Sequence, residues 1–343
     1  MTTVGFLPWW PTNPYQILLK QELNKLGVRV IGNPPLSLLR LLIGRDGLDV
    51  IHIHWPHGLY RNTAQLTYLV LVLLAYRLIR NNIVWTVHEL DAYESRHPRR
   101  DAWFRALVMR LSRRLIVHGE HTRRELIERH HYQRPIDVVR HPTYTGWYPD
   151  ETGRDQARVL LEIPPSARVY LYFGYIKPYK GVEDLIYAFT ALDDDAAILL
   201  IAGKPLNDTT KHKIESLAAS DIRIRTYLTY IPDESIQNFF RAADVAVFPF
   251  QHTQTSGSLM LALTYGCPVI APAIATIPEY VDRRSSVLFH PEQPGDLLRA
   301  LREIRVAPLD TMAMSARQLA NTFTWETMAA IHAAAYHAVK EHR

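Results

Sequence analysis

Two lysines three residues apart lie in a turn between an apolar segment and a helical pattern, in the stretch FGYIKPYKGVEDLI at 173–186. Gly174 and Gly181 bracket this turn, and Lys177 and Lys180 lie between them. Backbone N–H groups at a helix start, together with mobile ammonium groups, bind anions such as a diphosphate. The alternative interpretation is that both lysines are solvated loop residues without a ligand.

A second turn suited to phosphate lies within VAVFPFQHTQTSGSLMLALTYGCPVIAP at 245–272. A strand pattern ends at Pro249, a polar loop follows, and a helix opens at 256–258 and ends near Gly266. Small residues there let an anion approach backbone N–H groups, while hydroxyls donate or cap. Two such turns in one half of the chain indicate a nucleoside diphosphate. The residues predicted to bind it are Gly174, Lys177, Lys180, Thr255, Ser256, Gly257 and Ser258.

Polar side chains also follow a strand pattern in the first half, within TVHELDAYE at 86–94. An imidazole or carboxylate there can accept a proton from a hydroxyl group. We expect His88 to be a site residue, with Asp91 as the preferred carboxylate base and Glu89 behind it. The alternative for a single strand-end histidine is a hydrogen-bonded structural residue.

Histidines and aromatic residues follow two further strand patterns. His52 and His54 form a His-x-His pair, which can bind zinc, but no third ligand stands at readable spacing, so we predict core and hydrogen-bonding roles and no metal. The opening loop LPWWPTNPYQ carries aromatic faces that suit the apolar side of a sugar ring; the alternative is hydrophobic packing. The residues predicted to contact a sugar in this half are Trp9, Trp10, Asn13, Tyr15 and His57.

Short apolar runs alternate with helical patterns along the whole chain, which predicts an α/β fold with parallel sheets covered by helices. Ligands of such sheets bind beyond the carboxyl ends of the strands, and two doubly wound domains would hold a ligand in the cleft between them. The first helix is expected to begin with Asn13 as cap and Pro14 in its first turn, and to end at Gly27. The predicted strands lie at 3–7, 28–32, 49–54, 82–88, 114–119, 136–141, 169–174, 197–203, 222–228, 245–250, 268–272 and 286–290.

The predicted domains are 1–150, 151–324 and a terminal helix at 325–343 that crosses back to the first domain. Residues 141–169 are rich in Pro, Gly and charged side chains and are interpreted as the linker. The apolar run at 66–76 is shorter than the roughly 20 residues that span a bilayer, so we expect a buried core helix.

Charge is concentrated in the first half, where residues 1–150 hold 20 Lys and Arg against 12 Asp and Glu. Arginines and aromatic residues at 96–114 suit anionic lipid headgroups, although a solvated helix face is an equal alternative. No nucleic-acid motif accompanies the charge, so no nucleic acid is expected. A single cysteine, Cys267, fits a reducing compartment. The residues predicted to contact an anionic membrane are Arg96, Arg99, Arg100, Trp103 and Arg105.

Three stretches together resemble the carboxyl-terminal domain of GT-B glycosyltransferases, close to the group 1 (family 4) enzymes: FGYIKPYKGVEDLIYAF, AADVAVFPF, and SGSLMLALTYGCPVIAP followed by IPEYV. The order of elements matches over nearly the whole chain. The resemblance implies two Rossmann-like domains and a nucleotide-sugar donor. It also implies that Lys177 and Lys180 hold the donor's diphosphate, that the helix at Ser258 directs its dipole to it, and that His88 contacts a sugar.

The sequence departs from this family in several positions. The common retaining enzymes carry Glu, seven residues, then Glu in the second turn, and alignment on Gly266 places Thr253 and Leu261 there. Glu279 is the substitute expected for ribose recognition, and Tyr175 stands where an Arg is frequent. These changes favour an inverting branch, such as the β-mannosyl or glucuronosyl transferases of exopolysaccharide assembly.

The expected function is sugar transfer from a UDP- or GDP-sugar to a glycan or lipid-linked acceptor, without cofactor or metal. The expected place is the cytoplasm, with peripheral contact to the inner face of the plasma membrane. The alternatives are a retaining transferase, a nucleotide-sugar 2-epimerase, and a non-catalytic partner subunit.

Overall fold

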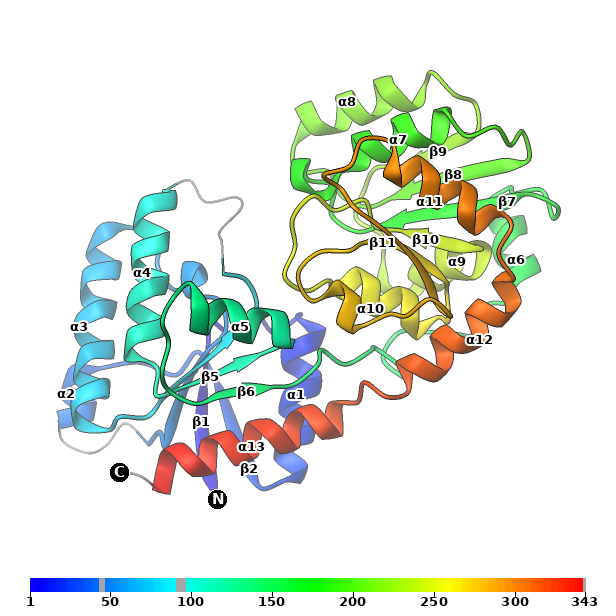
Figure 1. The fold of residues 1–343 in the computed structure, drawn as a ribbon. Coiled ribbons are helices and arrows are strands. Elements are labelled where there is room, and N and C mark those ends of the chain that lie inside the picture. Colours follow the sequence, from blue (N-terminus) through cyan, green and yellow to red (C-terminus); the bar gives the residue numbers. More distant parts are fainter. Residues whose placement is uncertain (43–46, 91–96, 342–343) are drawn as a thin grey trace. The chain divides into compact units, whose positions relative to one another are not determined.

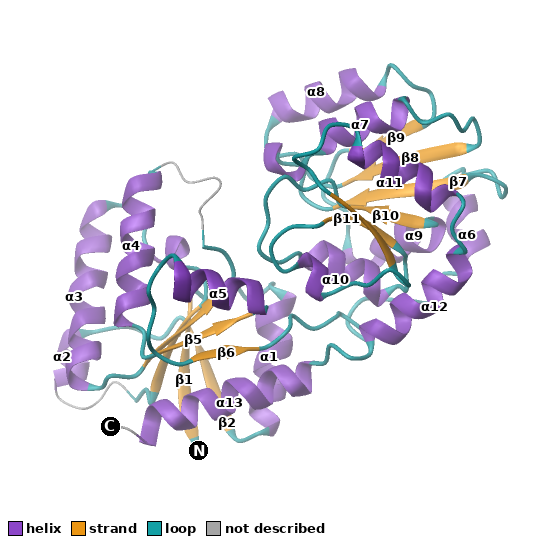
Figure 2. Ribbon diagram, in the orientation of Figure 1, coloured by secondary structure: helices purple, strands orange, loops and turns teal. Residues whose placement is uncertain are grey.

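The computed structural model describes residues 1–42, 47–90 and 97–341. Within them the strands form two six-stranded sheets whose strand pairs are all parallel (Figure 1). The chain divides into two compact units, Met1–His141 with Thr324–Arg343, and Pro142–Phe323. Figure 2 shows helices on both sides of each sheet, so the predicted α/β class is confirmed.

The first sheet has the strand order β2-β1-β3-β4-β5-β6. After β2 the chain returns to the other side of β1, so the order reverses between β1 and β3. In an open parallel sheet the ligand binds at such a reversal, beyond the carboxyl ends of the strands. The elements of this unit are β1 Thr2–Leu7, α1 Pro14–Lys25, β2 Val28–Gly32, α2 Leu38–Leu42, β3 Val50–Ile53, η1 Pro56–Leu59, α3 Thr63–Ile79, β4 Ile83–Val87, α4 Pro98–Leu111, β5 Arg114–Val117, α5 Glu120–Glu128, β6 Ile136–Val138 and α13 Trp325–Glu341.

The second sheet has the strand order β12-β11-β10-β7-β8-β9, which reverses between β7 and β10. Its core is built from the apolar runs that predicted the strands, since β8 and β10 are buried along their whole length. The elements are α6 Arg154–Leu160, β7 Arg168–Phe173, η2 Pro178–Lys180, α7 Val182–Thr190, β8 Ala197–Ala202, α8 Asp208–Ala218, β9 Ile224–Tyr227, α9 Asp233–Ala242, β10 Val245–Val247, α10 Gly257–Thr264, β11 Val269–Pro272, η3 Ile277–Glu279, β12 Ser286–Phe289, α11 Asp296–Arg305 and α12 Leu309–Ala320.

The start of the first helix, α1, follows the predicted chemistry. The Asn13 side chain accepts a hydrogen bond from the Tyr15 N–H at 3.0 Å, and Pro14 occupies the first turn of α1. The terminal helix α13 packs against α1 and the first sheet, as predicted. Its Tyr336 hydroxyl lies 2.6 Å from His52 Nδ1, which fixes the helix to a buried strand.

The predicted linker at 141–169 is wrong, because the stretch from 142 onwards is a structured part of the second unit. It contains α6, whose buried Arg158 donates to Asp244 at 2.9 Å. Upstream of α6, the Tyr144 N–H donates to Thr264 Oγ1 at 2.9 Å. The polar residues that suggested a linker therefore make contacts within the second unit. The two units divide at His141 instead of residue 150.

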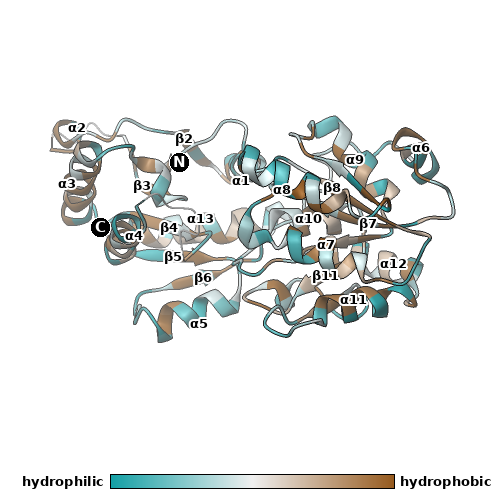
Figure 3. Ribbon diagram, turned by 90° about the horizontal axis from the view of Figure 1, so that it is seen from above, coloured by the Kyte–Doolittle hydropathy of each residue, from teal (hydrophilic) through white to brown (hydrophobic). Residues whose placement is uncertain are grey.

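Helix α3 is only half buried, although the sequence predicted a buried core helix. One stripe, which includes Leu66, Leu69, Leu73 and Tyr76, packs in the core of the first unit. The opposite stripe is exposed and also apolar, and Figure 3 colours much of α3 brown. No helix within the described residues is both long and apolar enough to cross a bilayer.

Candidate functional site

The turn after β7 requires glycine at both of its ends. Gly174 has φ +137° and Gly181 has φ +67°, values that side chains with a Cβ rarely adopt. A Cβ on Gly181 would lie 1.9 Å from the carbonyl oxygen of Pro249, just beyond β10. The turn therefore lies directly against the neighbouring strand, at the position where the strand order reverses.

Aromatic rings hold the two lysines of this turn. Lys180 Nζ lies 3.8 Å from the centroid of the Phe250 ring, which follows β10. Lys177 Nζ lies 5.6 Å from the ring of Tyr175, whose side chain is exposed. Both lysines are half-buried, and a ring face attracts an ammonium group. The two positive charges are thus kept at the carboxyl end of β7.

Helix α10 begins beside the same turn. The Ser256 side chain caps the helix by accepting from the Leu259 N–H at 3.3 Å. A Cβ on Gly174 would lie 2.7 Å from Ser258 Oγ, so the glycine turn and the helix start are in contact. The structure therefore brings both predicted phosphate-binding stretches to one place, where backbone donors, a dipole end and two ammonium groups meet.

The loop before α10 is fixed by hydrogen bonds among its own residues. Thr253 Oγ1 donates to the Thr255 carbonyl at 2.9 Å, and the Thr276 hydroxyl donates to the Gln254 carbonyl. Thr276 precedes η3, whose last residue is the half-buried Glu279, so Glu279 lies on a segment tied to this loop. Leu261 lies in the hydrophobic core and has no access to a ligand.

In the first unit a histidine follows each of four neighbouring strands. His54 follows β3, His88 follows β4, His118 follows β5, and His141 lies three residues beyond β6. The sequence predicted roles for His54 and His88 but none for His118 and His141. The signal was present, since both stand at the end of predicted strands.

His88 is half-buried whereas the other three histidines of this cluster are buried, and its ring is tightly held. The Trp55 ring stacks on it at 4.3 Å with an interplanar angle of 13°, and Trp10 stacks on Trp55 at 4.4 Å. His54 Nδ1 lies 3.3 Å from His88 Nε2. A partly exposed imidazole with one nitrogen fixed and one face covered is well placed to hydrogen-bond a ligand at the β1/β3 reversal.

Burial keeps these imidazoles neutral. Desolvation, with the neighbouring imidazoles, lowers the pKa of His88, His54 and His52 well below the usual value. Desolvation also lowers the pKa of His118 to about 3. A neutral His88 can accept a hydrogen bond from a sugar hydroxyl, but its lowered pKa makes it a weak proton acceptor.

The other predicted sugar contacts of this unit differ in exposure. Trp10 is exposed, and His57 Nδ1 lies 3.9 Å from Glu89 Oε1 at the same edge of the sheet. Tyr15 is buried, with its hydroxyl 3.3 Å from His118 Nε2. Three predicted residues of this unit remain: Trp9 and Asn13 as sugar contacts and Asp91 as the base. Trp9 packs against Gly32, Asn13 caps α1, and Asp91 lies outside the described residues.

His52 has the structural role that the sequence predicted. Its two ring nitrogens lie 2.6 Å from the Tyr336 hydroxyl and 2.7 Å from Thr86 Oγ1. In the part of the chain that the structure describes, no three His, Cys, Asp or Glu side chains are arranged to hold a metal ion.

The predicted membrane contacts on α4 are partly wrong. Arg105 is buried, because its position on the helix faces the core beside Phe104. Arg100 lies 3.7 Å from Asp101, so its charge is partly compensated. Arg99 and Trp103 are exposed, and Arg96 lies outside the described residues.

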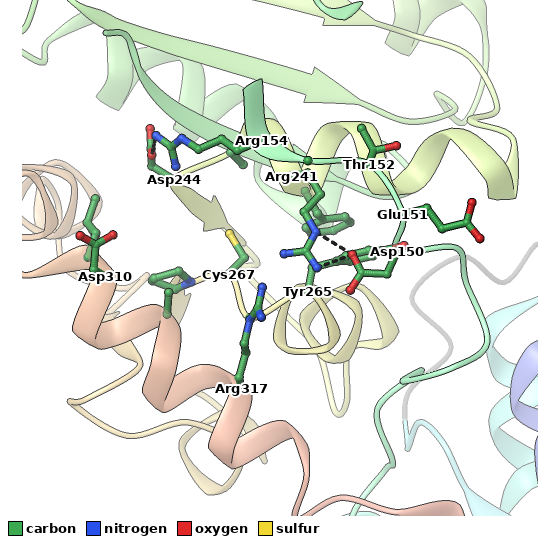
Figure 4. A pocket seen from close by; sticks show the side chains of 17 residues that line it. Asp150, Glu151, Thr152, Arg154, Arg241, Asp244, Tyr265, Cys267, Asp310 and Arg317 are labelled. Carbon is green, nitrogen blue, oxygen red and sulfur yellow. Dashed lines mark hydrogen bonds and ion pairs between the residues drawn. The ribbon is translucent and has the colours of Figure 1, made fainter. Parts of the chain in front are cut away.

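A pocket of about 450 Å³ lies elsewhere in the second unit (Figure 4). Asp244 and Cys267, which precede β10 and β11, contribute to it, so it lies at the amino-terminal edge of the sheet, away from Gly174. Arg154 pairs with Asp244, and Arg241 donates to Asp150 at 2.6 Å. These two arginines are paired with carboxylates, and the side chain of Arg317 also lines the pocket.

Comparison with known proteins identifies the family of the chain. A family model described as glycosyl transferases group 1 matches residues 167–305. The chain is also 30% identical over 284 residues to the GDP-mannose:glycolipid 4-beta-D-mannosyltransferase of Xanthomonas campestris pv. campestris, covering 79% of this chain and 75% of that protein. The chain belongs to the group 1 glycosyltransferases.

A further sequence relative and two solved structures are also similar to this glycosyltransferase. It is 32% identical over 239 residues to the D-inositol 3-phosphate glycosyltransferase of Mycolicibacterium gilvum, over 67% of this chain and 53% of that protein. Sucrose-phosphate synthase from Thermosynechococcus elongatus has a TM-score of 0.78 at 16% identity, with both chains fully covered. Anabaena HepE in complex with UDP and glucose has a TM-score of 0.73 at 16% identity, over 98% of this chain and all of that one. The fold is GT-B, as the resemblance implied.

Proposed function

We propose that this glycosyltransferase moves a mannosyl group from GDP-mannose to a lipid-linked acceptor, with inversion of the anomeric centre and without a metal ion. The observation that carries the proposal is the contact between the Gly174 turn and the start of α10, which joins two lysines and a helix dipole in one anion site. The mannosyltransferase that is 30% identical supports the donor and the acceptor class.

Lys177, Lys180 and the first N–H groups of α10 are proposed to bind the diphosphate of the donor. As the glycosidic bond breaks, negative charge grows on the departing GDP. Fixed positive groups stabilise that charge more strongly than the charge of the intact donor, and this difference lowers the barrier. Ser256 serves this site by capping α10, while Ser258 and Thr255 remain the hydroxyl donors of the proposal.

Inversion is supported by the side chains at positions 253 and 261. Thr253 is engaged with a loop carbonyl and Leu261 is in the core, so neither position supplies a carboxylate to the donor sugar. An inverting transfer needs a base at the acceptor hydroxyl. We assign this role to a carboxylate of 89–91, either Asp91 or Glu89. His88 orients a sugar hydroxyl, since its lowered pKa suits hydrogen bonding better than proton uptake.

The place of action proposed is the cytoplasmic face of the plasma membrane, where a lipid-linked acceptor would be met. Arg99 and Trp103 of α4 are exposed and support contact with anionic headgroups.

The test is an incubation of the chain with GDP-mannose, UDP-glucose and UDP-glucuronate in separate reactions, each with a bacterial membrane lipid extract. The expected result is release of GDP together with a β-mannosylated lipid, identified by NMR of the purified product. An α-linked product would overturn inversion. Conversion of the donor without an acceptor would indicate an epimerase, and the absence of any turnover would leave a non-catalytic subunit.

A further inference from the structure

Helix α3 carries a second apolar stripe that the core of the first unit does not use. The exposed residues recur every three or four positions on the side opposite the buried stripe, so they form one face. Helix α2, which packs beside α3, exposes leucines as well. We call this surface the α2–α3 face. Its exposed side chains are Leu39 (68%), Leu42 (70%), Tyr68 (49%), Leu71 (52%), Leu74 (36%) and Leu78 (84%).

The face is a continuous feature and not a scatter of single residues. The Tyr68 hydroxyl donates to the Leu36 carbonyl at 3.3 Å, which ties α3 to the segment that enters α2. Exposed apolar residues of the second unit, such as Ile222 and Val306, stand singly on a loop and at a helix end. Grouped apolar side chains on one surface mark a binding site more often than isolated ones do.

Within the described residues, the charged side chains of α2 and α3 have one sign. No Asp or Glu occurs at 50–88, and α2 has none either. Arg40 lies between the exposed leucines of α2, and Arg61 precedes α3; both are exposed and form no ion pair within the described residues. Arg77 lies in the last turn of α3. An apolar face bordered by arginines, with no carboxylate on α2 or α3 themselves, is complementary to anionic lipid headgroups above an acyl layer.

The same charges disfavour a second copy of this chain as the occupant. Two copies joined through this face would bring arginines near arginines, without a carboxylate of α2 or α3 to compensate them. The helix is also too short to span, since 17 residues extend about 25 Å and one stripe is packed in the core.

We propose that the α2–α3 face is a membrane-docking surface that lies flat in the headgroup region of an anionic bilayer, with the leucines of α2 and α3 inserted. This inference extends the proposed function, in which the acceptor is linked to a lipid. Only the purpose of the docking rests on that proposed function. The docking itself depends on side chains that have no part in nucleotide binding, so the two proposals fail separately.

The experiment is vesicle flotation of the full chain with phosphatidylcholine vesicles, with and without phosphatidylglycerol. The chain is expected to float with the anionic vesicles and much less with the neutral ones. The double substitution Leu71→Glu/Leu78→Glu should weaken binding to anionic vesicles at least about 10-fold, because it places charge in the apolar layer. The matched control Ile222→Glu/Val306→Glu adds the same charge to the second unit and should retain far more binding.

A variant of the two arginines and a measurement of GDP binding complete the experiment. Arg40→Glu/Arg61→Glu changes only exposed side chains and should weaken binding to anionic vesicles alone. GDP binding, measured on the same samples, should be unchanged in every variant. Wild-type binding by the Leu71→Glu/Leu78→Glu protein would overturn the proposal. Light scattering that shows a dimer in the parent chain and a monomer in this variant would overturn it in favour of self-association.

Discussion

Two lysines carry the chemical argument at the scale of single residues. Lys180 is held over the Phe250 ring and Lys177 near Tyr175, so their ammonium groups are positioned before a ligand arrives. Groups placed in advance stabilise a developing charge without the cost of reorganising at the moment of reaction. The sequence showed the two lysines, their spacing and the neighbouring Tyr175, but Phe250 comes from a distant position that only the fold brings near Lys180.

Replacement of Lys180 by Ala is expected to reduce turnover about 10²- to 10³-fold, because a positive charge facing the leaving diphosphate is lost. Steady-state kinetics with GDP-mannose would measure it. The control is Lys211→Ala on the exposed helix α8, where the ammonium group pairs with Glu215. Equal turnover of both variants would remove Lys180 from the mechanism.

His88 and His52 are expected to respond differently to substitution. His88→Ala removes a partly exposed ring and should lower turnover about 10-fold, the value of one hydrogen bond to a substrate, with little loss of stability. His52→Ala removes two buried hydrogen bonds and should destabilise the chain by about 2–4 kcal/mol. Urea unfolding separates the two effects. A stability loss for His88→Ala as large as that for His52→Ala would contradict the assignment.

At the scale of elements, the strands were the most predictable part. Each is a short apolar run, and all twelve predicted segments overlap a strand of the structure. The predictions failed where the same amino-acid composition is compatible with both a buried and an exposed segment. Residues 142–169 look like a linker because they are polar, yet Arg158 is buried against Asp244. Helix α3 looked like a core helix because it is apolar, yet one of its faces is exposed.

The β7–α7 turn depends on its glycine more than on its lysines. Gly181→Ala places a Cβ at a positive φ and against the Pro249 carbonyl, so the turn must move away from β10. GDP binding measured by calorimetry should weaken about 10-fold or more, with a smaller effect on folding.

Gly153 offers the matched control for that substitution. It has an ordinary φ of −75°, and nothing lies within 4 Å of the position a Cβ would take. Gly153→Ala should bind GDP like the parent chain. Unchanged GDP affinity in Gly181→Ala would show that the diphosphate does not use this turn.

At the scale of the whole molecule, two units built on one plan place their polar residues at the reversal of each sheet. The residues proposed to bind the donor lie at β7/β10, and those proposed to contact a sugar follow β1, β3 and β4. The rule that ligands bind where the strand order reverses predicts where a site lies, but not which side chains a ligand can reach. Tyr15 illustrates the gap, because its burial beside His118 results from packing by α1 that the sequence pattern does not encode.

The buried histidines make stability depend on pH. The pKa values of His52, His54, His88, His118 and His332 are all lowered by burial. The unfolded chain then binds more protons than the folded one below about pH 6.5. The free energy of unfolding should therefore be fully present above that pH and fall as the pH drops, by up to about 1.4 kcal/mol per pH unit for each histidine.

Urea unfolding of the full chain from about pH 7.5 down to about pH 5.5 would measure this slope. His332→Phe removes one buried protonation site. It should reduce the dependence of the free energy of unfolding on pH by the contribution of one histidine. A free energy of unfolding that does not change over this range would contradict the burial of the cluster.

The central claim is that the β7/β10 reversal of the second unit binds the diphosphate of the donor. A crystal structure of the chain with GDP tests it most directly. The account predicts the β-phosphate within hydrogen-bond distance of Lys180 Nζ and of the backbone N–H groups that begin α10. A diphosphate in the pocket lined by Arg154 and Arg317, or anywhere else away from Gly174, would contradict it.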